Sequence, residues 1–65
     1  MPHIAITMYP GRDAATKMAL AKKMQQAMVE ELHVDPSIIS VSIEDLPPEE
    51  WDAWIAKFSK ETMFI

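Results

Sequence analysis

Pro2 is the residue whose type and position carry the most chemical information in this sequence. The chain begins Met-Pro, and cells normally remove an initiator methionine that precedes so small a residue, so we expect a mature chain that begins at Pro2. The Pro2 nitrogen would then be a free secondary amine, with an ordinary pKa somewhat above the value of about 8 for an α-amine. Burial or a neighbouring cation would lower that pKa towards neutrality, where a general base works best.

Arg12 is the only arginine of the chain and the second residue that suggests chemistry. Its guanidinium presents a planar fork of donors that suits a carboxylate. A guanidinium close to the Pro2 nitrogen would also disfavour the protonated amine and lower its pKa. No carboxylate adjoins Pro2 in the sequence, where His3 and Ile4 follow. The two residues predict proton transfer beside a group that can bind a carboxylate.

Hydrophobic periodicity predicts the elements that position these residues. Apolar residues alternate from Ile4 to Tyr9, which is the period of a strand, and both faces are apolar enough to be covered. Pro10-Gly11 is a turn signal, and Asp13 is a good N-cap for a helix from about Ala14 to Leu32. The apolar stripe of this helix consists of Leu20, Met24, Ala27, Met28 and Leu32.

A second strand is predicted over Ile38 to Glu44, with Ile39, Val41 and Ile43 on its apolar face. Strand, helix and strand with short connections make a β-α-β unit, in which the strands are parallel and the crossover is right-handed. Pro47-Pro48 ends this strand and begins a short C-terminal helix. The apolar stripe of that helix consists of Trp51, Trp54, Ile55 and Phe58, ahead of a final segment (61–65) that is a short strand or a tail.

The composition excludes several classes of protein. A chain of 65 residues is long enough for one small domain, which we place over residues 1–65 with an α+β fold. The net charge of −4 argues against a nucleic-acid partner, and no apolar run approaches the roughly 20 residues of a membrane span. No signal peptide is recognisable, so we expect a cytoplasmic protein. Cysteine is absent, and His3 and His33 lack ligand spacing, so no metal site is expected.

The small size of the chain predicts a homo-oligomer. A chain of this length buries only about 60% of its unfolded surface and usually needs a disulfide, a metal or oligomerisation to be stable. A sheet of two strands also has two bare edges, and bare edges recruit partners. We therefore expect the sheet to continue into a second copy, with a dimer that has a four-stranded sheet as the minimum unit.

The sequence resembles the 4-oxalocrotonate tautomerase family, small β-α-β enzymes with an amino-terminal proline. The resemblance lies in MPHIAITMYPGR and ISVSIEDLPPEEW and covers nearly the whole chain. The segment SIEDLPPEEWDAW is most similar to the branch of phenylpyruvate and enol tautomerases, several of which are dimers. Another branch of the family is hexameric, so the resemblance leaves open a dimer or a hexamer built as a trimer of dimers. The resemblance implies a cofactor-independent tautomerase that moves a proton between the enol and keto forms of a small 2-oxo acid. Pro2 would be the general base, and Arg12 would bind the substrate carboxylate or polarise its carbonyl oxygen.

One departure from the family bears on the substrate. Members that act on dicarboxylates commonly carry a second arginine in the second strand, where this sequence has Ser40. The resemblance therefore favours a monocarboxylate, such as the enol of an arylpyruvate, with its ring against Trp51, Trp54 or Phe58. We take Ser40, His3 and Trp51 as candidate substrate-binding residues. Each of them has an alternative, purely structural role. Ser40 could be an ordinary polar residue of the strand, and His3 and Trp51 could pack within the chain or at a subunit interface.

Two other functions are open on the sequence alone. A non-catalytic oligomeric module would keep the fold and use its aromatic C-terminal face to bind a partner. Hydrolytic dehalogenation or decarboxylation would use the same proline together with activated water or a metal. The lack of further arginines and the weak case for a carboxylate that activates water make this last reaction less favoured. Glu44 and Asp45 are weak candidates for a second acid, because carboxylates at strand ends are commonly solvated.

Overall fold

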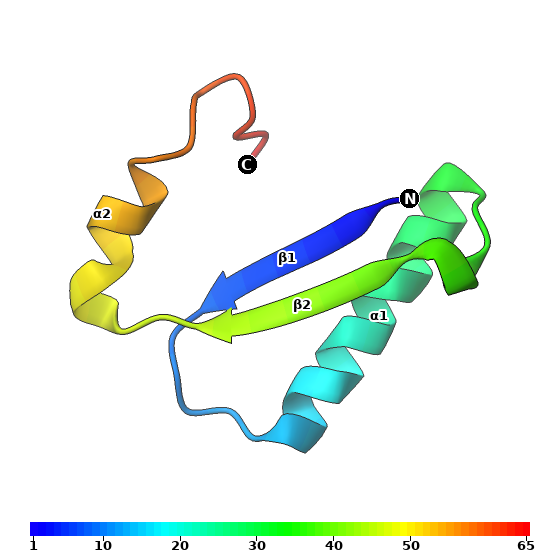
Figure 1. Cartoon of the computed structure of the whole chain (residues 1–65), viewed down its shortest axis with the longest axis horizontal. Coiled ribbons are helices and arrows are strands. Elements are labelled where there is room, and N and C mark those ends of the chain that lie inside the picture. The colour runs from blue at the N-terminus through cyan, green and yellow to red at the C-terminus, as the bar shows by residue number, and fades with distance from the viewer.

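The computed structural model describes residues 1–65 and has the element order strand, long helix, strand, short helix (Figure 1). This confirms the predicted β-α-β arrangement with two parallel strands, a long helix and a short C-terminal helix. The elements are β1 (His3–Met8), α1 (Ala14–Leu32), β2 (Ser40–Asp45) and α2 (Trp51–Ile55), with one-turn 3-10 segments over Pro36–Ile38 and Pro48–Glu50.

The two strands pair in parallel from His3 opposite Ser40 to Met8 opposite Asp45. The first strand was predicted over Ile4 to Tyr9, so the observed strand begins and ends one residue earlier. The reason is the hydrogen bonding of β2. The Ser40 amide donates to the Pro2 carbonyl at 3.3 Å, which starts the ladder next to His3. Beyond Met8 the chain bends at Pro10, whose nitrogen has no hydrogen to donate.

The second strand begins at Ser40 and not at the predicted Ile38, because the residues before it form a 3-10 turn over Pro36–Ile38. The Asp35 carboxylate accepts a hydrogen bond from the Ser37 amide at 2.8 Å and caps this turn. Hydrogen bonding from Ser37, by its hydroxyl first and by its amide second, lowers the pKa of Asp35 below its ordinary value. Pro36 occupies the first position of the turn, where the missing N–H costs nothing.

Helix α1 has the predicted bounds and the predicted N-cap. The Asp13 carboxylate accepts from the Thr16 amide at 2.8 Å, which satisfies one of the amides that a helix start leaves without a partner. At the other end the His33 amide donates to the Val29 carbonyl at 2.9 Å. His33 there adopts the left-handed conformation, with φ of 57°, which ends the helix in the manner usual for glycine.

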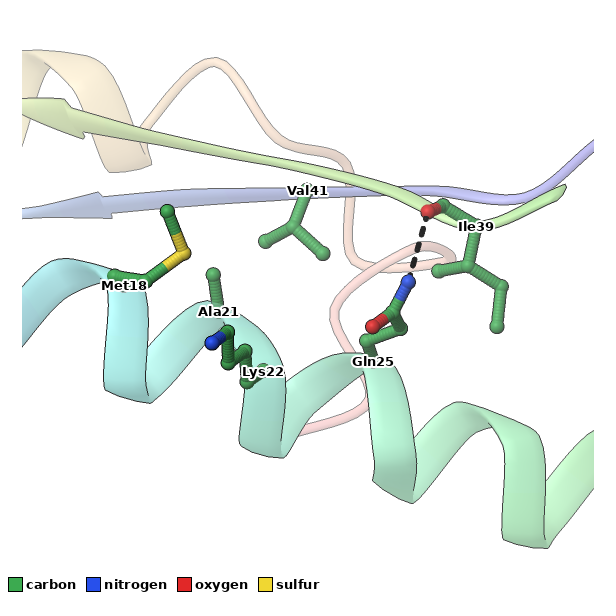
Figure 2. Close-up of a pocket in the computed structure, with 6 residues that line it drawn as sticks. All are labelled: Met18, Ala21, Lys22, Gln25, Ile39 and Val41. Atoms are coloured by element: carbon green, nitrogen blue, oxygen red, sulfur yellow. Dashed lines mark hydrogen bonds between the residues drawn. The ribbon is translucent and has the colours of Figure 1, made fainter. Parts of the chain in front are cut away.

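One face of the sheet packs against α1, mainly along β2. Figure 2 shows Ile39 and Val41 directed towards the helix, with Met18 and Ala21 directed towards the strand. The Gln25 side-chain amide donates to the Ile39 carbonyl at 3.4 Å. The space between helix and strand is an open groove of about 240 Å³. Because side chains alternate along a strand, the opposite face of the sheet carries His3, Ala5 and Thr7 from β1 and Ser40, Ser42 and Glu44 from β2.

A single chain buries very few of its residues. Ile39, at 6% exposure, is its one fully buried residue. The accessible surface is 5333 Å², whereas a compact monomer of this mass exposes about 4,200 Å². The radius of gyration is 13.4 Å, against about 10.7 Å for a compact chain of this length. None of the helices combines the length and the apolar character that crossing a membrane requires.

Candidate active site

Pro2 lies directly ahead of β1, at the end of the sheet where both strands begin (Figure 1). Its carbonyl accepts the hydrogen bond from the Ser40 amide, and its side chain is half-buried. Met1 extends beyond it and is 97% exposed. Met1 therefore makes almost no contact with the rest of the chain.

His3 lies between two serines of β2. Its Nδ1 is 2.6 Å from the Ser40 hydroxyl, and its Nε2 is 2.9 Å from the Ser42 hydroxyl. The register explains this contact, because Ser40 lies opposite His3 and Ser42 is the next residue on the same face of β2. Two predicted substrate-binding residues, His3 and Ser40, are thus brought together beside Pro2, with the hydroxyl of Ser40 already bonded to the imidazole.

Arg12 and Trp51 meet at the other end of the sheet, in a groove of about 300 Å³. Met8 and Tyr9 complete its lining. The Tyr9 and Trp51 rings pack edge to face, with centroids 5.1 Å apart and an angle of 84° between planes. Arg12 Nη1 donates to the Tyr9 carbonyl at 3.3 Å, a long bond that leaves most of the guanidinium donors free. This end of the sheet offers a cation next to two aromatic rings.

Sequence reasoning did not include Met8, Tyr9 or Ser42 among the functional residues. Tyr9 gave one usable signal, since it is an aromatic residue immediately before the Pro10-Gly11 turn that leads to Arg12. Met8 and Ser42 gave none. The positions of these residues depend on the register of the two strands and on where α2 begins. Local sequence patterns predict neither.

The turn before Arg12 depends on Gly11, which has φ of 126°. Side-chain-bearing residues rarely adopt this backbone conformation, and glycine adopts it freely. The space around Gly11 is open, so the requirement comes from the backbone and not from crowding. Gly11 therefore allows the sharp exit from β1 that brings Arg12 back towards Tyr9.

Neighbouring charges leave Arg12 available to a ligand. Asp13 is next to it in the sequence, but the Asp13 carboxylate is bonded to the Thr16 amide, which lowers the pKa of Asp13. The one ion pair of the chain joins Lys17 Nζ to the Asp45 carboxylate at 2.9 Å. Asp45, one of the weak candidates for a second acid, is thus paired with a cation. The structure has no group of three or more acidic or histidine side chains arranged to hold a metal ion.

The predicted site residues therefore form two groups. Pro2, His3 and Ser40 lie at the amino end of the strands, while Arg12 and Trp51 lie at their carboxyl end (Figure 1). The six residues of β1 separate them, a span of about 20 Å at 3.3 Å per residue. Two other aromatic residues of the C-terminal segment lie outside this groove: Trp54 of α2 packs on Phe58, which follows the helix, at 5.5 Å between centroids. One copy of the chain does not bring Pro2 and Arg12 together.

Comparisons with known proteins agree with this fold. The model of the tautomerase family, described as "Tautomerase enzyme", matches residues 2–53. The match begins at Pro2 and includes both groups of candidate residues. A solved structure of TomN, a 4-oxalocrotonate tautomerase homologue in the tomaymycin biosynthetic pathway, is 32% identical. It superposes with a TM-score of 0.72 over 77% of each chain.

Curated relatives point to the same family. A probable tautomerase of Xylella fastidiosa is 37% identical over 51 residues, which are 78% of this chain and 62% of the relative, so the match spans less than two thirds of that relative's length. Tautomerase PptA of Escherichia coli O127:H6 is 35% identical over 63 residues, which are 94% of this chain and 84% of the relative. With a family match that extends from Pro2 into α2, this chain belongs to the tautomerase family.

Proposed function

We propose that this chain is a cofactor-independent tautomerase that interconverts the enol and keto forms of a small 2-oxo acid. The observation that carries the proposal is the position of Pro2. It is the first residue of the family match, it lies directly ahead of the paired strands, and the Met1 ahead of it is almost fully exposed. Removal of Met1 makes the Pro2 nitrogen a secondary amine, which is the general base of the reaction.

The reaction requires two proton transfers at one nitrogen. The neutral amine of Pro2 takes the proton from the enol hydroxyl, and the oxygen forms the carbonyl bond as the C=C electron pair moves to the adjacent carbon. That carbon then takes the proton from the Pro2 ammonium, which returns the amine to its neutral form. A guanidinium beside the substrate stabilises the negative charge that builds up on oxygen between the two steps. No electrons enter or leave, so the step needs no redox partner.

Arg12 reaches the substrate from a second copy of the chain. Two copies that join their sheets edge to edge in antiparallel orientation place the amino end of β1 in one copy beside the carboxyl end of β1 in the other. A two-fold axis makes both resulting sites identical. The surface supports such an association, because the chain exposes about 1,100 Å² more than a compact monomer, and one side of a standard interface covers about 800 Å².

The groove at Arg12 favours an aromatic monocarboxylate as the substrate. The guanidinium suits one carboxylate, and the rings of Tyr9 and Trp51 lie against the same space. At the other end of the strands, Ser40 stands where dicarboxylate-specific relatives carry a second arginine, and its hydroxyl is bonded to His3. An arylpyruvate enol fits this arrangement better than a dicarboxylic dienol.

The test is the ketonisation of phenylenolpyruvate by protein whose intact mass shows that Met1 is absent. A variant with one serine inserted ahead of Pro2 converts the amine to an amide and is called the blocked variant below. We expect kcat of the blocked variant to fall by about 100-fold or more, since a positioned general base contributes 10² to 10⁴. Pro2→Ala keeps a primary amine and should fall less.

Three results would count against the proposal. Equal rates for the wild type and the blocked variant would remove the Pro2 amine from the reaction. A preference for 2-hydroxymuconate over phenylenolpyruvate would contradict the aromatic monocarboxylate. No activity on any enol substrate, with Met1 shown to be absent, would favour the non-catalytic binding module.

A further inference from the structure

The start of β1 makes few backbone hydrogen bonds to the rest of the sheet. Pro2 has no amide hydrogen to donate, so its carbonyl is its one backbone link to β2, through the 3.3 Å bond from Ser40. Residues at the end of a chain fray unless something anchors them. A base that transfers protons must nevertheless occupy one position, since a displacement of about 1 Å can cost 100-fold in rate.

The side chain of His3 supplies the missing anchor. Both ring nitrogens are used, one at 2.6 Å from the Ser40 hydroxyl and the other at 2.9 Å from the Ser42 hydroxyl. We propose that these three side chains form a clamp, the His3–Ser40–Ser42 clamp, that fixes the position of the Pro2 nitrogen. His3 is then a positioning residue for the proton transfer, and this inference rests on the proposed function of Pro2.

The geometry of the clamp suits this role. The imidazole is rigid, and its two nitrogens bond to serines two residues apart on β2, so the ring fixes β1 both across and along the neighbouring strand. Ser40 acts twice, because its hydroxyl bonds to His3 and its amide bonds to Pro2. Hydroxyls donate or accept as required, so both contacts persist whichever ring nitrogen carries the proton.

The clamp gives a role to Ser42, which substrate binding does not explain, and to His3, which packing of the apolar core does not explain. Ser42 has no place among the substrate-binding candidates, and His3 lies on the face of the sheet opposite α1, outside the apolar core. Hydrogen bonds at such an exposed face compete with water and add little to global stability. Their effect is therefore expected at the chain end that they hold, and not in the unfolding of the whole fold.

The first measurement is hydrogen exchange at the Ser40 amide, which donates to Pro2. We expect His3→Ala to speed this exchange by about tenfold through local opening, with much smaller changes at amides in the middle of α1. Thr7→Val is the matched control, because Thr7 lies on the same face of β1 and takes no part in the clamp. Unchanged exchange at Ser40 in His3→Ala would overturn the clamp, whatever the enzymatic activity.

The second measurement is the steady-state rate with phenylenolpyruvate. We expect His3→Ala and Ser42→Ala each to lower kcat by about tenfold with KM within about twofold. The double variant should be no worse than His3→Ala alone, because Ser42 acts through His3. Ser42→Thr, which keeps the hydroxyl, should restore kcat. Additive losses, or a kcat of His3→Ala within twofold of the wild type, would overturn the positioning role.

The blocked variant separates the two proposals. If blocking the amine leaves the rate unchanged, the proposed function of Pro2 fails and the positioning role fails with it, while the exchange of the Ser40 amide still shows whether the clamp exists. If blocking abolishes the rate and His3→Ala leaves both kcat and exchange unchanged, the clamp alone fails.

Discussion

Pro2 and Arg12 lie at opposite ends of β1, so the strand that connects the proposed base to the proposed carboxylate-binding cation also keeps them apart. Each end of the sheet has its own set of partners: His3 and Ser40 beside Pro2, and Tyr9 and Trp51 beside Arg12. If Pro2 and Arg12 act on one substrate, as proposed, a single copy carries two half-sites. Antiparallel association of two copies is then the simplest way to form whole ones.

Replacement of Arg12 tests the cationic half-site. We expect Arg12→Ala to lower kcat/KM for phenylenolpyruvate by about 10- to 100-fold, the range for losing a hydrogen bond to a charged group. Arg12→Lys keeps the charge but loses the planar fork, so it should recover only part of the loss. Steady-state kinetics of the three proteins measures this, and an Arg12→Ala variant within twofold of the wild type would exclude a substrate contact.

Replacement of Trp51 tests the aromatic wall. Trp51→Leu removes one ring of the edge-to-face pair with Tyr9, so we expect kcat/KM for phenylenolpyruvate to fall by about tenfold, in line with the worth of an aromatic contact. The enol of pyruvate, which has no ring, should be affected much less. Trp54→Leu is the matched control, because Trp54 packs on Phe58 outside the groove. Equal losses for both enols would argue that Trp51 only supports the fold.

The N-cap of α1 gives a prediction about pH. The hydrogen bond from the Thr16 amide lowers the pKa of Asp13 below its ordinary value of 3.8. A carboxyl with a lowered folded-state pKa stabilises the fold above the unfolded value and loses that contribution as the pH falls through the folded value. Asp13→Ala should therefore have a lower melting temperature than the wild type at neutral pH, with a difference that shrinks as the pH falls below 3.8.

Asp13→Asn is the control for this experiment. Asparagine is a good N-cap without a charge. The Asp13→Asn variant should therefore keep most of the wild-type stability at neutral pH, and its melting temperature should depend less on pH in the acid range. Thermal unfolding followed by circular dichroism, at matched protein concentration, measures all three proteins. A difference between wild type and Asp13→Ala that persists undiminished well below pH 3.8 would contradict the ionised cap.

The C-terminus of α1 gives a prediction about backbone strain. His33 has φ of 57°, a conformation that costs a residue with a side chain about 1 kcal/mol and costs glycine much less. We expect His33→Gly to raise the free energy of unfolding by about 1 kcal/mol, whereas His33→Ala should bring no gain. Urea titrations at equal protein concentration measure the change, and a destabilised His33→Gly would show that the imidazole makes a contribution larger than the strain.

Local signals in the sequence predicted the elements well. Asp13 marked the start of α1, and the alternation of Ile39, Val41 and Ile43 identified the strand that packs on it. The bounds of β2 could not be read in this way, because the 3-10 turn at Pro36 is capped by the Asp35 carboxylate, which accepts a hydrogen bond from the Ser37 amide. This hydrogen bond forms only once the backbone has turned, so the sequence pattern alone does not show that residues 36–38 form a turn and not the start of the strand.

The site was harder to predict than the fold, because it depends on distance and register. The sequence identified Pro2 and Arg12 as chemical groups, but only the strand between them shows that they lie at different ends of the sheet. The contact between His3 and Ser42 requires the parallel register, which a single sequence does not specify. The contact between Tyr9 and Trp51 requires the position of α2 relative to the end of β1.

The most direct test of the account mixes two impaired proteins, the blocked variant and Arg12→Ala. Each lacks one half of every site, so when assayed alone on phenylenolpyruvate the blocked variant should keep about 1% of the wild-type rate or less and Arg12→Ala about 1 to 10%. After unfolding and refolding together in equal amounts, half of the dimers contain one chain of each kind, and one of their two sites has both a free Pro2 amine and an intact Arg12. We expect about one quarter of the wild-type rate from this mixture. A mixture that stays at the mean of the two separately measured rates, although native mass spectrometry shows mixed dimers, would contradict a site shared between two copies.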